Sequence, residues 1–390
     1  MLINLNKLKT AFKEKRLIKS IYYKIYPYFV GLIFLFKKKK IKISINKLNK
    51  IDLIDLSLSA KIFESYKKMK NEQEKIGDLY KPSSLWQKHL DKDYEIINNS
   101  IKNNDLEEFL FFLQNFGNWK NYLGIESHDL IQKYNSNILL KSFLEESIFG
   151  GQLRIWKYFN NNKNDFSDLN MPRFGNQIGA TIDGNFIVIG SFFNDIYSSI
   201  LNEYSNINKK TVIAELGGGY GKFAYYFIKK VKNYSFINFD IPEVLVLSMY
   251  YLIKSFPSKN YFLFGDKIFD NSLLDKYDLL FLPSWEIEKI NNDYIDIFIN
   301  QTSLGEINPE AAKNYINHIC RISKLFFSSN HETFRNKFEN QKFSLINKEY
   351  PISKNFQLLI RYSDIGHMTY QQNKINFDSD IFFYIYKKNN

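Results

Sequence analysis

The sequence predicts an α/β fold in which a doubly wound, mainly parallel sheet follows a mostly helical N-terminal region. From about residue 171 onward, short apolar runs typical of strands alternate with amphipathic segments typical of helices. A glycine-rich turn separates the best-defined strand from the helix after it. Before about residue 165, apolar residues recur three and four apart instead, which is the helical period. We therefore expect a mainly helical region over 1–165 and an α/β domain over 171–390.

The elements can be placed in order along the chain. Helical spacing in the first region is clearest over 59–77 and 105–117, and the polar stretch "FNNNKNDFSDLN" separates the two regions. In the second region helices are expected at 222–231, at 242–256 and after Pro309, where proline suits a first helical turn. Strands are expected at 185–191, 211–216, 234–240, 261–266, 277–285, 296–307, 324–330, 356–363 and 380–388.

Composition limits the classes of function. Of the 390 residues, 45% are hydrophobic and 17% aromatic, which is enough for a packed core. The net charge of +12 comes from lysines dispersed along the whole chain, so we expect no nucleic-acid partner. The single cysteine, Cys320, excludes an internal disulfide and a cysteine-based metal cluster and fits a reducing cytoplasm. Its helical apolar neighbours predict a packed thiol.

The N-terminal end carries an apolar run over 25–36 followed by Lys37, Lys38, Lys39 and Lys40. Twelve residues are too few to span a bilayer. Lysines occupy the place where a signal peptide would have its cleavage site. A buried element is the favoured interpretation, and peripheral contact with the anionic inner face of the membrane is the alternative.

The segment "TVIAELGGGYGKFAYYF" predicts a ligand site. Its glycines, among them Gly217, Gly219 and Gly221, allow positive φ angles and close approach of a ligand to the backbone. The helix after them offers unpaired N–H groups. Two interpretations fit the spacing. E-x-G-x-G-x-G resembles motif I of class I S-adenosylmethionine-dependent methyltransferases, whereas G-x-G-x-x-A with Asp240 downstream suits a dinucleotide.

The carboxylate of Glu215 favours the first interpretation. A dinucleotide would bring a pyrophosphate to this turn, where Glu215 would repel it. A cationic methyl donor would instead be attracted by the Glu215 carboxylate. Asp240, at the end of "YSFINFD", could accept hydrogen bonds from ribose hydroxyls, or cap the helix that begins at Pro242.

Three segments together resemble a bacterial family of sugar O-methyltransferases: "AELGGGYGKFAYYF", "FDIPEVLVLSMYYL" and "FINQTSLGEINPEAAKNYINHI". The resemblance covers about residues 171–330. Ile307 stands where the family usually has Met, and the N-terminal half has no match. The resemblance implies a Rossmann-like class I methyltransferase fold, S-adenosylmethionine as the donor, and a carbohydrate hydroxyl as the acceptor, in surface glycan or polysaccharide synthesis. The acceptor could be a nucleotide sugar, a lipid-linked glycan or a finished polymer.

Carried over residue by residue, the resemblance assigns the methionyl end of the donor to Glu215, Gly217, Gly219 and Gly221, and the ribose to Asp240. Asp266, which ends the strand in "LFGD", is a candidate for the adenine amine, or else it caps its own turn.

Methyl transfer to a hydroxyl needs a base at the carboxyl edge of the sheet. His331 follows a strand there and ranks first, and Glu306 competes with it, unless Glu306 only stabilises the helix entered at Pro309. Asn300 and Ser303 could hydrogen-bond a sugar or the donor, and His367 lies in a loop that could reach the acceptor. The sequence has no metal-binding signature, so no metal is expected.

Two other functions remain open. A nicotinamide-dependent sugar oxidoreductase would use the dinucleotide interpretation of the glycine turn. A non-catalytic, membrane-associated glycan-assembly protein would use the basic N-terminal end instead of the turn.

Overall fold

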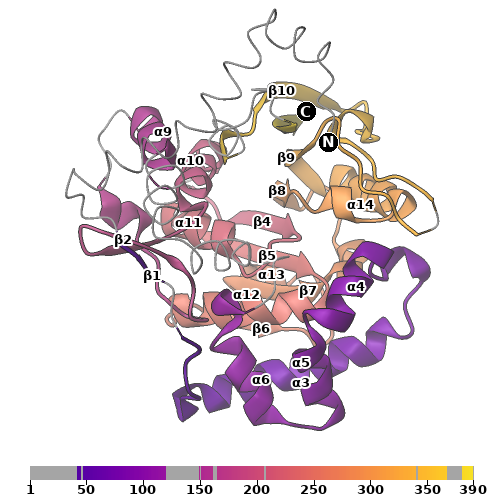
Figure 1. Ribbon diagram of the computed structural model, residues 1–390. Helices are drawn as coiled ribbons and strands as arrows, with labels where there is room; N and C mark the ends of the chain where they lie inside the picture. The colour runs from indigo at the N-terminus through magenta and orange to yellow at the C-terminus, as the bar shows by residue number, and fades with distance from the viewer. Residues whose placement is uncertain are drawn as a thin grey trace, which may run out of the picture.

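An eight-stranded sheet runs through the centre of the computed structural model, in the order β10-β11-β9-β8-β4-β5-β7-β6 (Figure 1). The pairs from β9 to β6 are parallel, and β11 and β10 add two antiparallel strands at the other edge. This arrangement confirms the predicted mainly parallel, Rossmann-like α/β sheet and the mostly helical N-terminal region. The strands are β4 (Thr211–Leu216), β5 (Tyr234–Asp240), β6 (Tyr261–Leu263), β7 (Leu279–Pro283), β8 (Ile295–Gln301), β9 (Ser323–His331), β10 (Phe356–Ser363) and β11 (Ile381–Lys388).

The structure describes residues 42–44, 47–119, 149, 151–160, 165–205, 208–339, 341–366 and 380–389. The apolar run over 25–36 and the lysines that follow it lie outside these residues, as does His367. Within the described ranges, every helix is too short or too polar to cross a bilayer.

The central strands are buried along their whole length. All six residues of β4 and all seven of β5 are buried, as expected for parallel strands covered on both faces. Polar side chains appear within these strands only toward their carboxyl ends, apart from Thr211 and Ser235. The buried runs fix the strands, and the polar ends mark the edge of the sheet where ligands bind in this fold class.

The helices begin and end where the sequence places strong local signals. Proline occupies the first turn of α12 and of α14, and Gly221 immediately precedes α11 with a positive φ of 89°. Cys320 is buried in α14, as predicted, and burial raises the pKa of its thiol. The helices are α3 (Leu56–Gln73), α4 (Ser84–Lys92), α5 (Glu95–Lys102), α6 (Leu106–Leu113), α9 (Gly151–Phe159), α10 (Ser191–Asn202), α11 (Lys222–Lys230), α12 (Pro242–Ser255), α13 (Leu273–Lys276) and α14 (Pro309–Ile322).

The N-terminal helices pack directly on the α/β part. Figure 1 shows α3, α5 and α6 gathered beside α12 and the β6 edge of the sheet. Ser65 Oγ of α3 donates to the carbonyl of Phe264 at 2.8 Å, just beyond β6. A small antiparallel sheet also joins β1 (Lys42–Ser44) to β2 (Gly179–Ile182) and β3 (Asn185–Val188). The described residues on both sides of the predicted boundary thus share one core.

Asp55 is the polar link between these two parts. Its buried carboxylate accepts hydrogen bonds from Tyr250 Oη at 2.6 Å, Lys254 Nζ at 2.5 Å and Gln114 Nε2 at 3.1 Å. Burial alone would raise the pKa of Asp55, but the hydrogen bonds from Lys254, Tyr250 and Gln114 hold it below its usual value. One carboxylate therefore ties the start of α3 and the end of α6 to α12.

Replacing Asp55 by Asn should lower the free energy of unfolding by about 2–3 kcal/mol, because Lys254 and Tyr250 lose a charged acceptor in a buried site. Urea denaturation at neutral pH measures the change. Glu64→Gln is the control, since Glu64 pairs with Lys67 on the exposed side of α3 and should change stability by no more than about 0.5 kcal/mol. Equal effects for the two variants would contradict the assigned role of Asp55.

Candidate functional site

The candidate site lies at the carboxyl edge of the sheet, where β4, β5, β8 and β9 end next to one another. Parallel strands bring their carboxyl ends to a common edge. In this structure that edge gathers Glu215 from β4, Asp240 from β5 and the segment after β8 that contains Glu306. His331 ends the neighbouring strand, β9.

The glycine turn after β4 folds tightly over the end of its own strand. Gly217 has a φ of +74°, and a Cβ at this position would lie 2.4 Å from Ser303 Oγ. A Cβ at Gly218 would lie 2.7 Å from Glu215 Oε2. The turn therefore needs glycine both for its backbone conformation and for the close approach of neighbouring polar groups.

Glu215 lies behind this turn with an unsatisfied oxygen. The residue is only 2% exposed, and its Oε2 has no hydrogen-bond partner among the described residues. Asn238 lies opposite it in the β4–β5 register, is 1% exposed, and has both amide atoms unpaired within the same described ranges. Buried polar atoms without partners cost about 1–3 kcal/mol each. This concentration of them at a glycine turn indicates that a polar ligand completes the site.

The acidic side chains at this edge have pKa values well above their usual range. Burial raises the pKa of Glu215 to about 8, and the charge of Asp240 adds to the increase while a hydrogen bond from Gln301 opposes it. Burial likewise raises the pKa of Asp240 to about 7, although the backbone N–H groups of Ile241 and Gly219 favour its charged form. The charges of Glu306 and Glu243 contribute to the same increase. We call these four residues (Glu215, Asp240, Glu243 and Glu306) the carboxylate cluster.

A lysine balances the charge of one member of the carboxylate cluster, whereas the other three members have no such partner among the described residues. Lys70 Nζ lies 2.6 Å from Glu243 Oε1. Over the part of the chain that the structure describes, Glu215, Asp240 and Glu306 have no ion pair with Lys, Arg or His. In the same ranges, the acidic, His and Cys side chains do not converge closely enough to form a metal site. The arrangement therefore suits an extended cationic ligand with hydrogen-bond donors.

Glu306 is held in place by the N-terminal region. Trp86 Nε1 donates to Glu306 Oε2 at 3.0 Å, and Ser83 Oγ donates to the backbone carbonyl of Glu306 at 2.7 Å. Burial raises the pKa of Glu306 to about 7, against the hydrogen bond from Trp86. A carboxyl group with this pKa can exchange protons near neutral pH. The start of α4 thus forms one wall of the site.

Asn300 and Ser303 support the glycine turn from the next strand. Asn300 Nδ2 donates to the carbonyl of Leu216 at 2.9 Å, and its Oδ1 accepts from Asn330 Nδ2 at 2.9 Å. Ser303 Oγ donates to the same Leu216 carbonyl at 3.1 Å. Asn300 is fully buried, whereas Ser303 is partly exposed. The amide of Asn300 is thus engaged in fixing the end of β4, so direct contact between Asn300 and a ligand stays a prediction.

His331 and Asp380 form a pair beside Glu306. His331 Nδ1 is hydrogen-bonded to Asp380 Oδ2, and the His331 ring lies over Gly305, where a Cβ would be 3.9 Å from Cδ2. Burial alone would raise the pKa of Asp380, but hydrogen bonds from Thr333, His331 and the Phe334 backbone hold it below its usual value. An anchored carboxylate on Nδ1 orients an imidazole so that Nε2 can accept a proton.

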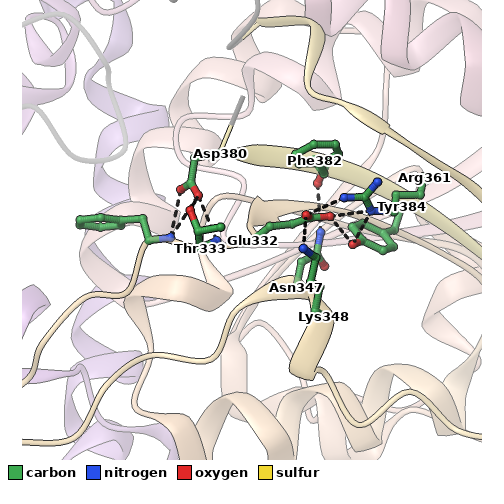
Figure 2. Close-up of polar contacts among 9 residues, drawn as sticks. Glu332, Thr333, Asn347, Lys348, Arg361, Asp380, Phe382 and Tyr384 are labelled. Carbon is green, nitrogen blue, oxygen red and sulfur yellow. Dashed lines mark hydrogen bonds and ion pairs between the residues drawn. The ribbon is translucent and has the colours of Figure 1, made fainter. Parts of the chain in front are cut away.

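The residue after His331 has a different environment. Figure 2 shows Asp380 bonded to Thr333 on one side, while Glu332 lies on the other side among Arg361, Lys348 and Tyr384. Arg361 binds the Glu332 carboxylate through two nitrogens, at 2.7 and 2.6 Å, and Lys348 Nζ lies 2.8 Å away. This network ties β9, β10 and β11 together at the end that carries His331.

The structure brings most of the predicted residues together but not Asp266. The order β6-β7-β5 places β7 between the strand that precedes Asp266 and the strand that ends at Asp240, so these two strands lie two spacings, or about 10 Å, apart. Asp266 is exposed and accepts the N–H of Leu263 in its own turn, at 3.3 Å. This contact matches the alternative role, a loop carboxylate capping its turn. His367 lies outside the described residues, so its role stays a prediction.

Sequence reasoning missed Asn238, Trp86, Asp380 and Trp285. Asn238 had a detectable signal, since it is a polar residue in an apolar strand, two positions before Asp240 and on the same face. Trp285 follows β7, which pairs with β5, and its buried indole N–H has no partner among the described residues. Trp86 and Asp380 had no signal, because they reach the site only through the tertiary fold.

Comparisons with known proteins give no family. No family model matches the chain, and no curated protein matches it. Among solved structures, the mitomycin 7-O-methyltransferase MmcR is 9% identical, with a TM-score of 0.32 over 50% of this chain and 56% of MmcR. A SAM-dependent methyltransferase from Aquifex aeolicus is 13% identical, with a TM-score of 0.29 over 48% of this chain and 87% of its own. The small RNA methyltransferase HEN1 is 12% identical, with a TM-score of 0.34 over 50% of this chain and 25% of HEN1. Likenesses at this level carry no functional argument.

The raised pKa of Glu215 predicts how stability depends on pH. Between about pH 5 and pH 8 the folded ligand-free protein holds a proton on Glu215 that the unfolded chain has lost. Raising the pH through this window therefore lowers the free energy of unfolding, by at most about 1.4 kcal/mol per pH unit for this group. Glu215→Gln should remove this contribution, so its stability relative to wild type should rise between pH 5.5 and 8.5 in urea titrations. Glu107→Gln, at an exposed position on α6, is the control. A pH-independent difference for Glu215→Gln would contradict the prediction.

Proposed function

We propose that this chain is an S-adenosylmethionine-dependent O-methyltransferase that acts on a sugar hydroxyl in the synthesis of surface glycans or polysaccharides. The observation that supports this most is the unpaired oxygen of Glu215 behind the glycine turn, together with the absence of an ion-pair partner for Glu215 and Asp240 among the described residues. A ligand that carries positive charge and hydroxyl groups would satisfy both carboxylates.

S-adenosylmethionine fits this set of groups. Its ammonium and sulfonium charges would lie near Glu215, and Asn238 could hydrogen-bond the methionyl end. Asp240, the last residue of β5, would accept hydrogen bonds from the ribose hydroxyls. The tight turn at Gly217 and Gly218 brings Ser303 and Glu215 close to its backbone.

The carboxylate cluster disfavours the dinucleotide alternative. A pyrophosphate at the same turn would bring two more negative charges next to Glu215 and Asp240, whose pKa values are already raised by burial and by neighbouring carboxylates. Repulsion between like charges in a buried site costs several kcal/mol. A nicotinamide-dependent oxidoreductase therefore ranks below methyl transfer.

The chemistry assigned to this chain is alignment and proton removal. When bound, S-adenosylmethionine would supply an electrophilic methyl group, and this chain would align the acceptor oxygen with it. His331 accepts the hydroxyl proton at Nε2, while Asp380 on Nδ1 stabilises the imidazolium that forms. Glu306 is the second candidate base, because it lies next to Gly305 and its pKa of about 7 is suitable. Ser303, partly exposed at the glycine turn, remains a candidate for contact with the ligand.

We assign contacts with the acceptor partly to the N-terminal region. Ser83 and Trp86 form the wall at Glu306, where Phe334, on the His331 side, adds an exposed ring 5.1 Å from the imidazole. Aromatic faces and carboxylates are common in sites that take a hydroxylated ring. We place the reaction in the cytoplasm, where a lone thiol stays reduced, with the basic N-terminal end available for contact with the inner membrane face.

Isothermal titration should show that wild-type protein binds S-adenosylmethionine and S-adenosylhomocysteine and does not bind NAD or NADP. Glu215→Gln should weaken S-adenosylmethionine about 10- to 100-fold, or about 1.4–2.7 kcal/mol, because the cation loses its counter-charge. Asp240→Asn should weaken the binding of both S-adenosylmethionine and S-adenosylhomocysteine. Glu107→Gln should weaken the binding of neither. Dinucleotide binding without S-adenosylmethionine binding would overturn the proposal.

The same titration carries a second test of charge. Glu215 is protonated below about pH 8 in the free protein, so a cation must displace that proton. Affinity should therefore rise with pH toward 8, by up to about tenfold per unit for one released proton. The binding heat should also depend on the ionisation enthalpy of the buffer. An affinity that is constant from pH 6 to 8 would contradict the assignment of Glu215.

Substitutions at His331 and Asp380 test the base. In single-turnover methyl transfer to a panel of sugars and nucleotide sugars, His331→Asn should slow the reaction about 10²- to 10⁴-fold with little change in donor affinity. Asp380→Asn should slow it less, because the imidazole keeps a hydrogen-bond acceptor but loses the charge. If His331→Asn is fully active and Glu306→Gln is inactive, Glu306 is the base instead.

A further inference from the structure

A separate cavity lies between the N-terminal helices and the first turn of α12. Its volume is about 190 Å³, and it is lined by α3, the segment before α4, α4 itself, α5 and Glu243. The residues that matter below are Lys70, Gln73, Pro82, Leu90 and Glu243. We call it the α3–α12 cavity.

Two of the side chains that line this cavity are buried and carry unpaired polar atoms. Gln73 is 7% exposed and Glu243 is fully buried. Lys70 Nζ donates to Gln73 Oε1 and to Glu243 Oε1, both at 2.6 Å. Because lysine has only donors, this contact fixes which amide atom of Gln73 is the oxygen. Gln73 Nε2 and Glu243 Oε2 then have no partner among the described residues.

The two unpaired atoms define the chemistry of the missing group. Gln73 Nε2 can only donate and Glu243 Oε2, as a carboxylate oxygen, can only accept, so the group that satisfies both must accept and donate. A hydroxyl does so. Lys70 and Glu243 compensate each other's charge, which favours a neutral ligand. Pro82 and Leu90 supply an apolar surface for the carbon face of a ring.

The size of the cavity agrees with a small ligand. A volume of 190 Å³ corresponds to about six water molecules at roughly 30 Å³ each. It lies below the range of roughly 300–1,000 Å³ for sites that hold drug-sized ligands. One hydroxylated ring fits these dimensions.

The cavity adjoins the candidate active site. Glu243 lies three residues after Asp240, and its charge helps to raise the pKa of Asp240. Lys81 and Pro82 line the cavity, while Ser83 and Trp86, next along the chain, contact Glu306. One segment of the N-terminal region thus borders both places.

We propose that the α3–α12 cavity binds a neutral hydroxylated ring of the acceptor, with Gln73 and Glu243 as the residues that select it. The identification of this ring as part of the methyl acceptor rests on the proposed function. The hydrogen-bonding requirement of the cavity is independent of the reaction. The ribose of the donor carries the same chemistry, so the experiment must separate the two sources.

The test measures sugar binding and donor binding to the full chain separately. Ligand-observed NMR with glucose, galactose, N-acetylglucosamine, rhamnose and myo-inositol, without S-adenosylmethionine, should show saturable binding of at least one. Gln73→Met removes the amide N–H group, which is a hydrogen-bond donor, with little change in side-chain size. It should weaken sugar binding about fivefold or more. Gln357→Met, the same change at an exposed position on β10, is the matched control and should leave it unchanged. Urea denaturation establishes that both variants are folded.

Titration with S-adenosylhomocysteine distinguishes the sources. An unchanged affinity in Gln73→Met, together with weaker sugar binding, supports the acceptor assignment. Weaker S-adenosylhomocysteine binding without any sugar binding overturns it, because the cavity then holds the donor ribose. Absence of both effects also overturns it and leaves a water-filled cavity. Sugar binding by a protein that fails to bind S-adenosylmethionine would contradict the proposed function but not the cavity.

Discussion

The site depends on one electrostatic constraint: buried carboxylates converge on the carboxyl ends of β4 and β5, and the described residues place no cation against Glu215 or Asp240. Strand pairing enforces the convergence, because the β4–β5 register and the following turns bring Glu215 and Asp240 to one edge. Side chains cannot relieve it by moving apart, since Glu215 is covered by Gly218 and Asp240 is held by the N–H groups of Gly219 and Ile241. Protonation relieves it in the free protein, and a cationic ligand would relieve it in the bound one.

The N-terminal helices belong to this site as much as the sheet does. Trp86 and Ser83 hold Glu306, and Lys70 pairs with Glu243, so the helical region contacts two members of the carboxylate cluster. The α/β part alone would leave these groups open to water, where their pKa values would return toward ordinary ones. Packing of α3 on α12 therefore sets the charge state of the site as well as the stability of the fold.

The sequence predicts some parts of this arrangement well because they depend on local signals. The strand Thr211–Leu216 and the helix beginning at Pro242 could be placed to within a residue, since apolar runs are bounded by glycine or proline. The position of Asp266 could not be judged, because the sequence shows that β6 and β7 exist but not which of them pairs with β5. Partners far apart in the chain were also beyond reach, as for Trp86 and Glu306, which are 220 residues apart. Such pairs are defined by tertiary packing alone.

Other buried carboxylates of the chain show what ordinary compensation looks like here. Asp55 forms an ion pair with Lys254, and Asp195 Oδ1 lies 2.7 Å from Lys230 Nζ. Glu332 forms ion pairs with Arg361 and Lys348. A chain with 53 Lys and Arg residues thus supplies cations where a buried carboxylate serves the fold. At Glu215 and Asp240 the described residues supply none, although an uncompensated buried charge is costly. Since the chain balances charge elsewhere, the imbalance at this edge is best explained by a ligand that brings the positive charge with it.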